Sequence, residues 1–139
     1  MNISIVPPDR VTECWEEVAP LLQPAIDRSG GRFLIQDVYH LVRTGDNHLW
    51  VMFEDGIIVA CCTTTFTQYP RKRMLTGQFL GGKKLSQWAY NLDIVLEKWG
   101  RDNGCDGIEL TGRRGWVRVL DKLGWNLNYY ITEKNYGKR

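Results

Sequence analysis

The sequence predicts an α+β, or mixed α/β, fold in a single domain that spans residues 1–139. Strand-like and helical hydrophobic periods follow one another in the order β-α-α-β-β-β-α-β-α-β, which favours a central, mostly antiparallel twisted sheet with helices packed on it. The length of 139 residues suits one domain. A content of 43% hydrophobic and 24% charged residues is typical of a globular protein.

The first third of the chain predicts one strand and two helices. Ile3–Val6 forms a short strand that ends at the prolines after it, because proline has no N–H to donate to a sheet. A helix is expected over Val11–Asp27, and two prolines inside it should kink it or split it in two: Pro20 and Pro24. A second helix is expected over Leu34–Arg43.

The middle of the chain predicts a meander of three strands. The strands His48–Glu54 and Ile57–Gln68 flank Asp55-Gly56, which is a strong signal for a tight hairpin turn. A fourth strand, Met74–Leu80, then runs into Gly81-Gly82. We therefore expect the antiparallel part of the sheet to lie here.

The C-terminal part predicts two helices and two strands. The helix at Lys84–Asp102 has a clear apolar face, and a short strand at Gly107–Leu110 follows it. A basic helix is expected over Arg113–Leu123. Apolar and polar residues then alternate over Asn126–Glu133, which predicts a last strand.

Several classes of protein are not favoured. The longest apolar run, Ile57–Cys62, is far shorter than the ~20 residues that cross a bilayer, so no membrane association is expected. The N-terminus has neither a basic leader nor an apolar stretch, so secretion is not expected. Four cysteines without a Cys-x-x-Cys pair and only two histidines favour neither a metal site nor disulfides, and they suggest a cytoplasmic protein.

The net charge of +2 hides an asymmetry between the two halves of the chain. Residues 1–70 hold four Arg against nine Asp and Glu, whereas residues 71–139 hold fourteen Lys and Arg against seven Asp and Glu. A basic half suggests an anionic partner, such as a phosphorylated cofactor, a nucleic acid or an acidic protein surface. Solvated helix faces would give the same excess, so charge alone leaves both interpretations open.

The fourth strand and the residues after it resemble a family motif. Gln78-Phe79-Leu80-Gly81-Gly82-Lys83, followed by a long amphipathic helix, is similar to the Gln/Arg-x-x-Gly-x-Gly/Ala loop of the GCN5-related N-acetyltransferase (GNAT) superfamily. The order of elements resembles the same family over nearly the whole chain. The resemblance implies that backbone amides here hold the pyrophosphate of acetyl-CoA, the cosubstrate. The physical chemistry agrees, because glycines allow a phosphate to approach closely and helix N-termini attract anions.

The last predicted helix carries a second resemblance. Its end, Leu120-Asp121-Lys122-Leu123-Gly124-Trp125, is similar to the Tyr-Glu-Lys-Leu-Gly-Phe at the same place in GNAT proteins. The short, Trp-rich chain also resembles small GNAT-like proteins encoded by tailed phages. The resemblance implies cosubstrate contacts along strand four, at the start of the following helix and on the last helix, at Gln78, Phe79, Leu80, Gly81, Gly82, Lys83, Lys84, Leu85 and Arg113.

Three residues depart from the family pattern, and one of them is Arg113, which stands where the last helix usually has an asparagine. Lys83 stands where the loop usually has Gly or Ala, and its ammonium can serve as a point charge for phosphate. Leu120 stands where the family often has a tyrosine that protonates the departing thiolate. Leucine cannot donate a proton. Either another group does so, or the protein does not catalyse acetyl transfer.

An amine acetyltransferase needs a base for the ammonium group and a donor for the thioester oxygen. Glu109 lies between two apolar residues of a predicted strand, so its carboxylate can face a cleft as the base or simply face solvent. Tyr130 is a candidate acid, as are Tyr129 and Tyr69, although strand tyrosines more often pack in a core. His48 begins a strand and is more typical of a surface or capping residue.

Three functional hypotheses follow. The first is an acyl-CoA-dependent N-acyltransferase, an N-acetyltransferase by resemblance, in which a small-molecule amine or a protein lysine attacks directly in a ternary complex. The second is a catalytically inactive GNAT-fold protein with a structural or assembly role, such as a phage virion component or a homo-oligomer, and the bulky Trp116 and Trp125 fit it. Nucleic-acid binding is not favoured, because no known binding motif is present.

Overall fold

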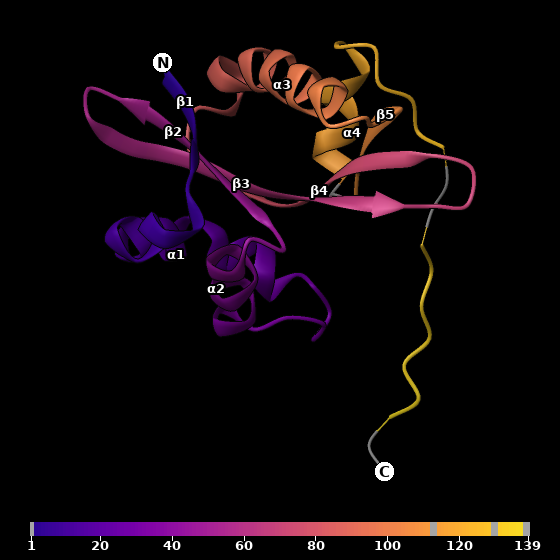
Figure 1. Cartoon of the computed structure of the whole chain (residues 1–139). Coiled ribbons are helices and arrows are strands. Elements are labelled where there is room, and N and C mark those ends of the chain that lie inside the picture. Colours follow the sequence, from indigo (N-terminus) through magenta and orange to yellow (C-terminus); the bar gives the residue numbers. More distant parts are fainter. Residues whose placement is uncertain (1, 112–113, 129–130, 138–139) are drawn as a thin grey trace.

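The computed structural model describes residues 2–111, 114–128 and 131–137. In these residues the chain forms one sheet between two helical layers (Figure 1). The elements follow one another as β1 (Asn2–Val6), the 3-10 helix η1 (Pro8–Arg10), α1 (Val11–Asp27), α2 (Ile35–Thr44), β2 (His48–Glu54), β3 (Ile57–Gln68), β4 (Arg73–Gly82), α3 (Leu85–Asp102), β5 (Gly107–Leu110) and α4 (Arg114–Asp121).

The sheet is mixed and mostly antiparallel, as the sequence predicted. Its strands lie in the order β1-β2-β3-β4-β5, with antiparallel pairing from β1 to β4 and a parallel β5 beside β4. The helices α1 and α2 lie on one face of the sheet, and α3 and α4 lie on the other (Figure 1). β5 is reached through α3, which is the usual crossover between parallel strands.

Each face of the sheet buries its own apolar cluster. Val18 and Leu22 of α1 pack with strand residues on one face, whereas Trp88 and Leu92 of α3 pack on the other. Adjacent strand residues point to opposite faces, so Cys61 belongs to the first cluster and Cys62 to the second. All four cysteines are free thiols.

A β-bulge interrupts the pairing of β4 with β3. Thr63 pairs with Phe79 and the next residue, Thr64, pairs with Gly77, so Gln78 is an extra residue in β4. On its other edge, β4 pairs with β5 only as far as Gly77, opposite Leu110. Among the described residues, β4 therefore continues beyond the bulge with a strand partner on one side only.

The first helix runs unbroken from Val11 to Asp27, so the predicted split at the prolines is wrong. Pro20 and Pro24 both lie on the exposed face of α1. The carbonyl groups that lose their partners to these prolines belong to residues four positions earlier, which are also exposed and can bond to water.

Two further predictions need correction. The fourth strand does not stop at Leu80, because Gly81 and Gly82 pair with Cys61 and Ala60 of β3. The predicted last strand, Asn126–Glu133, is absent from the part of it that the structure describes. Alternation alone does not make a strand, since its backbone groups need a neighbouring strand, and this segment runs away from the sheet (Figure 1).

None of the helices in the described ranges combines the length and apolar character that crossing a bilayer requires.

Candidate functional site

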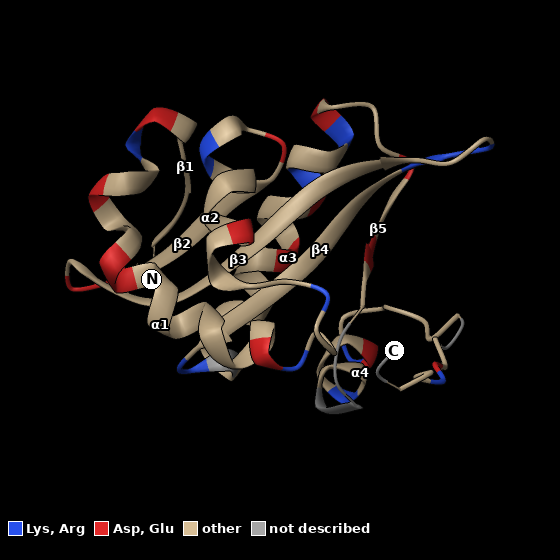
Figure 2. Cartoon of the chain, turned by 90° about the horizontal axis from the view of Figure 1, so that it is seen from below, with Lys and Arg blue, Asp and Glu red and all other residues tan. Residues whose placement is uncertain are grey.

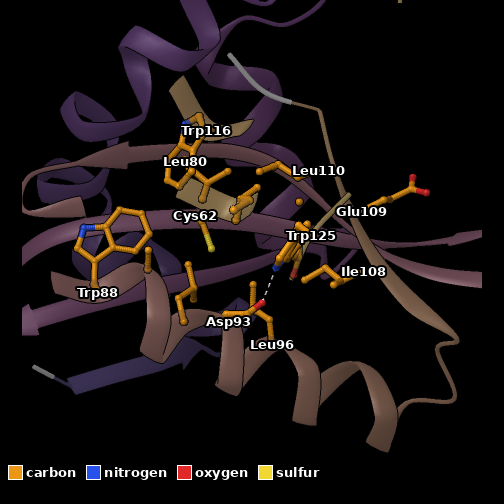
Figure 3. Close-up of a pocket in the computed structure, with 15 residues that line it drawn as sticks. Cys62, Leu80, Trp88, Asp93, Leu96, Ile108, Glu109, Leu110, Trp116 and Trp125 are labelled. Carbon is orange, nitrogen blue, oxygen red and sulfur yellow. Dashed lines mark hydrogen bonds between the residues drawn. The ribbon is translucent and has the colours of Figure 1, made fainter. Parts of the chain in front are cut away.

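An apolar cavity of about 40 Å³ lies where β4 and β5 separate beneath α3 and α4. Its walls come from β3, β4 and β5 together with α3, α4 and the residues after α4, and include Cys62, Leu80, Trp88, Leu96, Ile108 and Trp116 (Figure 3). The polar side chains at its border belong to Thr64, Asp93 and Glu109. Leu120, at the family's tyrosine position, also lines the cavity, so this wall offers no phenol.

Three tryptophans fix the helical side of this cavity. The indole N–H of Trp88 donates to the carbonyl oxygen of Lys83 at 2.7 Å and so ties α3 to the connection before it. Trp116 of α4 lies against Trp88 with ring centroids 5.8 Å apart. Trp125 donates to Asp93 of α3 at 2.8 Å, a contact visible in Figure 3, and this bond holds the end of the α4 segment onto α3.

Gly81 and Gly82 owe their identity to packing within the sheet. A Cβ atom on Gly81 would overlap the backbone carbonyl of Leu21 in α1, so glycine is what lets α1 approach β4. Gly82 has a φ of +129° and would place a Cβ into the backbone of Ala60. A close approach of protein backbone thus accounts for both residues, and the predicted contact of these glycines with a phosphate stays a prediction.

Most of the other predicted cosubstrate residues lie between the second half of β4 and the start of α3. Leu80 lines the cavity, whereas the buried ring of Phe79 packs on the opposite face of the sheet against Phe33, with centroids 5.2 Å apart. Lys83 is exposed, and Lys84 forms an ion pair with Glu54 of β2 at 2.9 Å. Leu85 is the first residue of α3. Arg113 lies outside the described residues.

Glu109 is half-buried on β5, and its carboxylate points away from the centre of the cavity (Figure 3). Its Oε2 accepts hydrogen bonds from the Tyr69 phenol at 2.7 Å and from the Thr76 hydroxyl at 3.1 Å. Thr76 is next in sequence to Leu75, which packs against α3, so the carboxylate lies on the α1–α2 side of the sheet. The other predicted catalytic residue, Tyr130, lies outside the described residues.

Sequence reasoning missed a polar network beside the cavity. The Thr64 hydroxyl accepts the indole N–H of Trp50 at 2.9 Å and lies 2.8 Å from Nδ1 of His48. Burial lowers the pKa of His48, so the imidazole is neutral at pH 7. The Thr-rich run on β3 was visible in the sequence, but its bonds depend on strand register.

Cys62, whose side chain lines the cavity, does not have the properties of a reactive nucleophile. Burial raises the pKa of Cys62, and it raises the pKa of Cys61 to about 12. A thiol is reactive only as its thiolate. Burial therefore keeps the Cys62 side chain in its neutral thiol form.

Comparisons with known proteins bear on the fold. No protein-family model and no curated protein matches the sequence. Among solved structures, a ribosomal-protein-alanine N-acetyltransferase from Brucella melitensis biovar Abortus is similar, with 14% identity, a TM-score of 0.73, and 98% of this chain and 99% of that chain covered.

Two more acetyltransferase structures match over nearly their whole length. An aminoglycoside acetyltransferase from an uncultured soil metagenomic sample has 15% identity and a TM-score of 0.73, covering 98% of each chain. A predicted acetyltransferase from Clostridium acetobutylicum, solved with acetyl-CoA, has 13% identity and a TM-score of 0.70, covering 96% of this chain and 95% of that one. The chain therefore has the fold of the GCN5-related N-acetyltransferases.

Proposed function

We propose that this protein is an acyl-CoA-dependent N-acyltransferase, with acetyl-CoA as its cosubstrate. The observation that carries the proposal is the opening between β4 and β5, where one edge of β4 borders an apolar cavity instead of a strand. Backbone groups on such an edge need partners. The pantetheine arm of coenzyme A carries amide groups that can bond to Gln78–Leu80 and complete the sheet there.

The start of α3 suits the phosphate end of the same ligand. An 18-residue helix presents unpaired N–H groups and a partial positive charge at its N-terminus. Lys83, exposed just before the helix, adds a full charge. The cosubstrate would then run from Lys83 and Leu85 along Leu80 into the cavity.

The acceptor amine would approach from the α1–α2 side, where the Glu109 carboxylate lies. Glu109 takes the proton from the ammonium, and the free amine attacks the thioester carbon. A C–N bond forms and the C–S bond breaks. The proton that the new amide nitrogen loses passes through water to the departing thiolate. Tyr69 and Thr76 fix the orientation of Glu109 through their hydrogen bonds. The acidic residues of α1, whose positions on the ribbon are red in Figure 2, favour a cationic acceptor.

Replacing Glu109 by Gln tests the assignment of the base. We expect kcat to fall about a hundredfold or more, because general bases contribute at least that much. The affinity for acetyl-CoA, measured by titration calorimetry, should stay within twofold of wild type. Glu97→Gln on the exposed surface of α3 is the matched control. Full turnover by the Glu109 variant would exclude this residue as the base.

A catalytically inactive scaffold is the second candidate. It is favoured by the size of the cavity, about 40 Å³, and by the tryptophans that close its helical side. Leu120 on its wall cannot replace the missing phenol. A protein that neither binds acetyl-CoA nor transfers an acyl group would support this second candidate and exclude the first.

A further inference from the structure

Three polar side chains are buried in the part of the chain that the structure describes, and all three lie at the bulge of β4 or directly beside it. They are Asn47, Thr63 and Thr64, with exposed fractions of 4%, 0% and 0%. Thr63 and Thr64 are the two β3 residues between which the pairing with β4 shifts. Asn47 lies immediately before β2 and reaches across the sheet to the bulged residue.

Asn47 holds the side chain of the extra residue. Its Nδ2 donates to Oε1 of Gln78 at 2.6 Å. Its own backbone N–H donates to the carbonyl oxygen of Leu41 in α2 at 3.0 Å, so the turn that carries Asn47 is fixed as well. The side chain of Gln78 is thereby tied to the loop between α2 and β2.

Thr63 holds the backbone on the far side of the bulge. The backbone N–H of Phe79 donates to the hydroxyl oxygen of Thr63 at 3.3 Å. An extra residue disturbs the regular ladder, and a hydroxyl here gives the buried N–H of Phe79 an acceptor. Thr64 is the third of these buried polar residues and lies on the cavity side, where its hydroxyl forms hydrogen bonds with Trp50 and His48.

Buried polar groups are costly unless they are bonded, so a regular strand with apolar neighbours would be the simpler way to build this part of the sheet. The bulge lies one residue beyond Gly77, the last β4 residue that pairs with β5. We propose that Asn47 and Thr63 are positioning residues that hold β4 in its bulged course and thereby keep the opening beside β5 in the shape that receives the acyl thioester. This inference rests on the proposed function.

Thr63→Val tests the proposal with little change in shape, since valine keeps the volume and removes the hydroxyl. We expect the dissociation constant for acetyl-CoA and its KM to rise about tenfold, whereas Thr63→Ser, which keeps the hydroxyl, should stay within twofold of wild type. Thr65→Val is the matched control, because the Thr65 hydroxyl also makes one hydrogen bond but donates it to the carbonyl oxygen of Asp46 at 2.9 Å and not to a residue of β4. Asn47→Leu should weaken binding in the same way as Thr63→Val.

Amide hydrogen exchange without ligand gives the second readout. The amides of Phe79 and Leu80 should exchange at least tenfold faster in Thr63→Val than in Thr65→Val. If wild type binds acetyl-CoA and Thr63→Val binds it equally well, the inference is wrong while the proposed function stands. If wild type itself does not bind acetyl-CoA, the proposed function fails, and the positioning role for a thioester fails with it.

Discussion

At the scale of single residues, Gly81 illustrates how one sequence signal can have two physical causes. The motif around it resembles a phosphate-binding loop, and a glycine is required there for phosphate approach. In the structure the same glycine lies in β4, where the backbone of α1 leaves no room for a side chain. Sequence alone identifies the need for glycine but not the neighbour that imposes it.

Gly81→Ala should lower the free energy of unfolding by several kcal/mol, because α1 must move away from the sheet to admit the methyl group. Gly100→Ala in α3 is the control, since a Cβ there meets its nearest neighbour at 3.6 Å and alanine favours helix by about 0.5–1 kcal/mol. Urea unfolding measures both variants. Equal stability of Gly81→Ala and wild type would refute the close packing of α1 on β4.

At the scale of secondary-structure elements, hydrophobic periodicity predicted most of the fold. The bounds of α1, β2, β3 and β5 match their predicted ranges, because each has a clear period and a Pro, Gly or Asp-Gly signal beside it. The predicted last strand failed because pairing is a tertiary property. Its described residues touch the body through the Arg32–Glu133 ion pair at 2.8 Å.

The docking of α4 on α3 is a second property of elements that the sequence could not provide. Trp125 and Asp93 are 32 residues apart, and their bond depends on how the two helices meet. In the sequence, Trp116 and Trp125 stand out only for their bulk, and the structure shows that both line the cavity.

A pair of Trp→Phe variants tests this docking. Trp125→Phe removes a hydrogen bond to a carboxylate and should cost about 1.5–3 kcal/mol in addition to lost packing. Trp99→Phe should lower the free energy of unfolding only through lost packing, because the buried indole N–H of Trp99 has no hydrogen-bond partner among the described residues. Thermal or urea unfolding compares the two. If Trp99→Phe lowers the free energy of unfolding as much as Trp125→Phe does, the hydrogen bond from Trp125 to Asp93 adds no measurable stability.

At the scale of the whole molecule, the candidate site forms only when the chain is folded. Glu109 and Leu80 were predicted from sequence, but the network of Thr64, Trp50 and His48 was not. The charges also separate, with acidic residues along α1 and basic residues at the β3–β4 turn (Figure 2). The predicted asymmetry between the halves of the chain thus corresponds to different parts of the surface.

His48 should make global stability depend on pH. Burial lowers its pKa in the folded state below the ordinary value of 6.5, so the unfolded chain binds the proton more readily. The contribution of neutral His48 to the free energy of unfolding is therefore fully present above pH 6.5 and is lost as the pH falls below that value. Between pH 8 and pH 5, the free energy of unfolding measured with urea should fall less for His48→Gln than for wild type. Parallel profiles for the two proteins would contradict the burial of a neutral imidazole.

The most direct test of the proposed function is titration calorimetry of the protein with acetyl-CoA. We expect a micromolar dissociation constant, about −8 kcal/mol, and a higher melting temperature with ligand. Lys83→Glu should weaken binding at least tenfold, whereas Lys98→Glu, near the other end of α3, should leave it within twofold. No heat and no stabilisation at millimolar acetyl-CoA would contradict the proposed function and leave the fold as a scaffold without a cosubstrate.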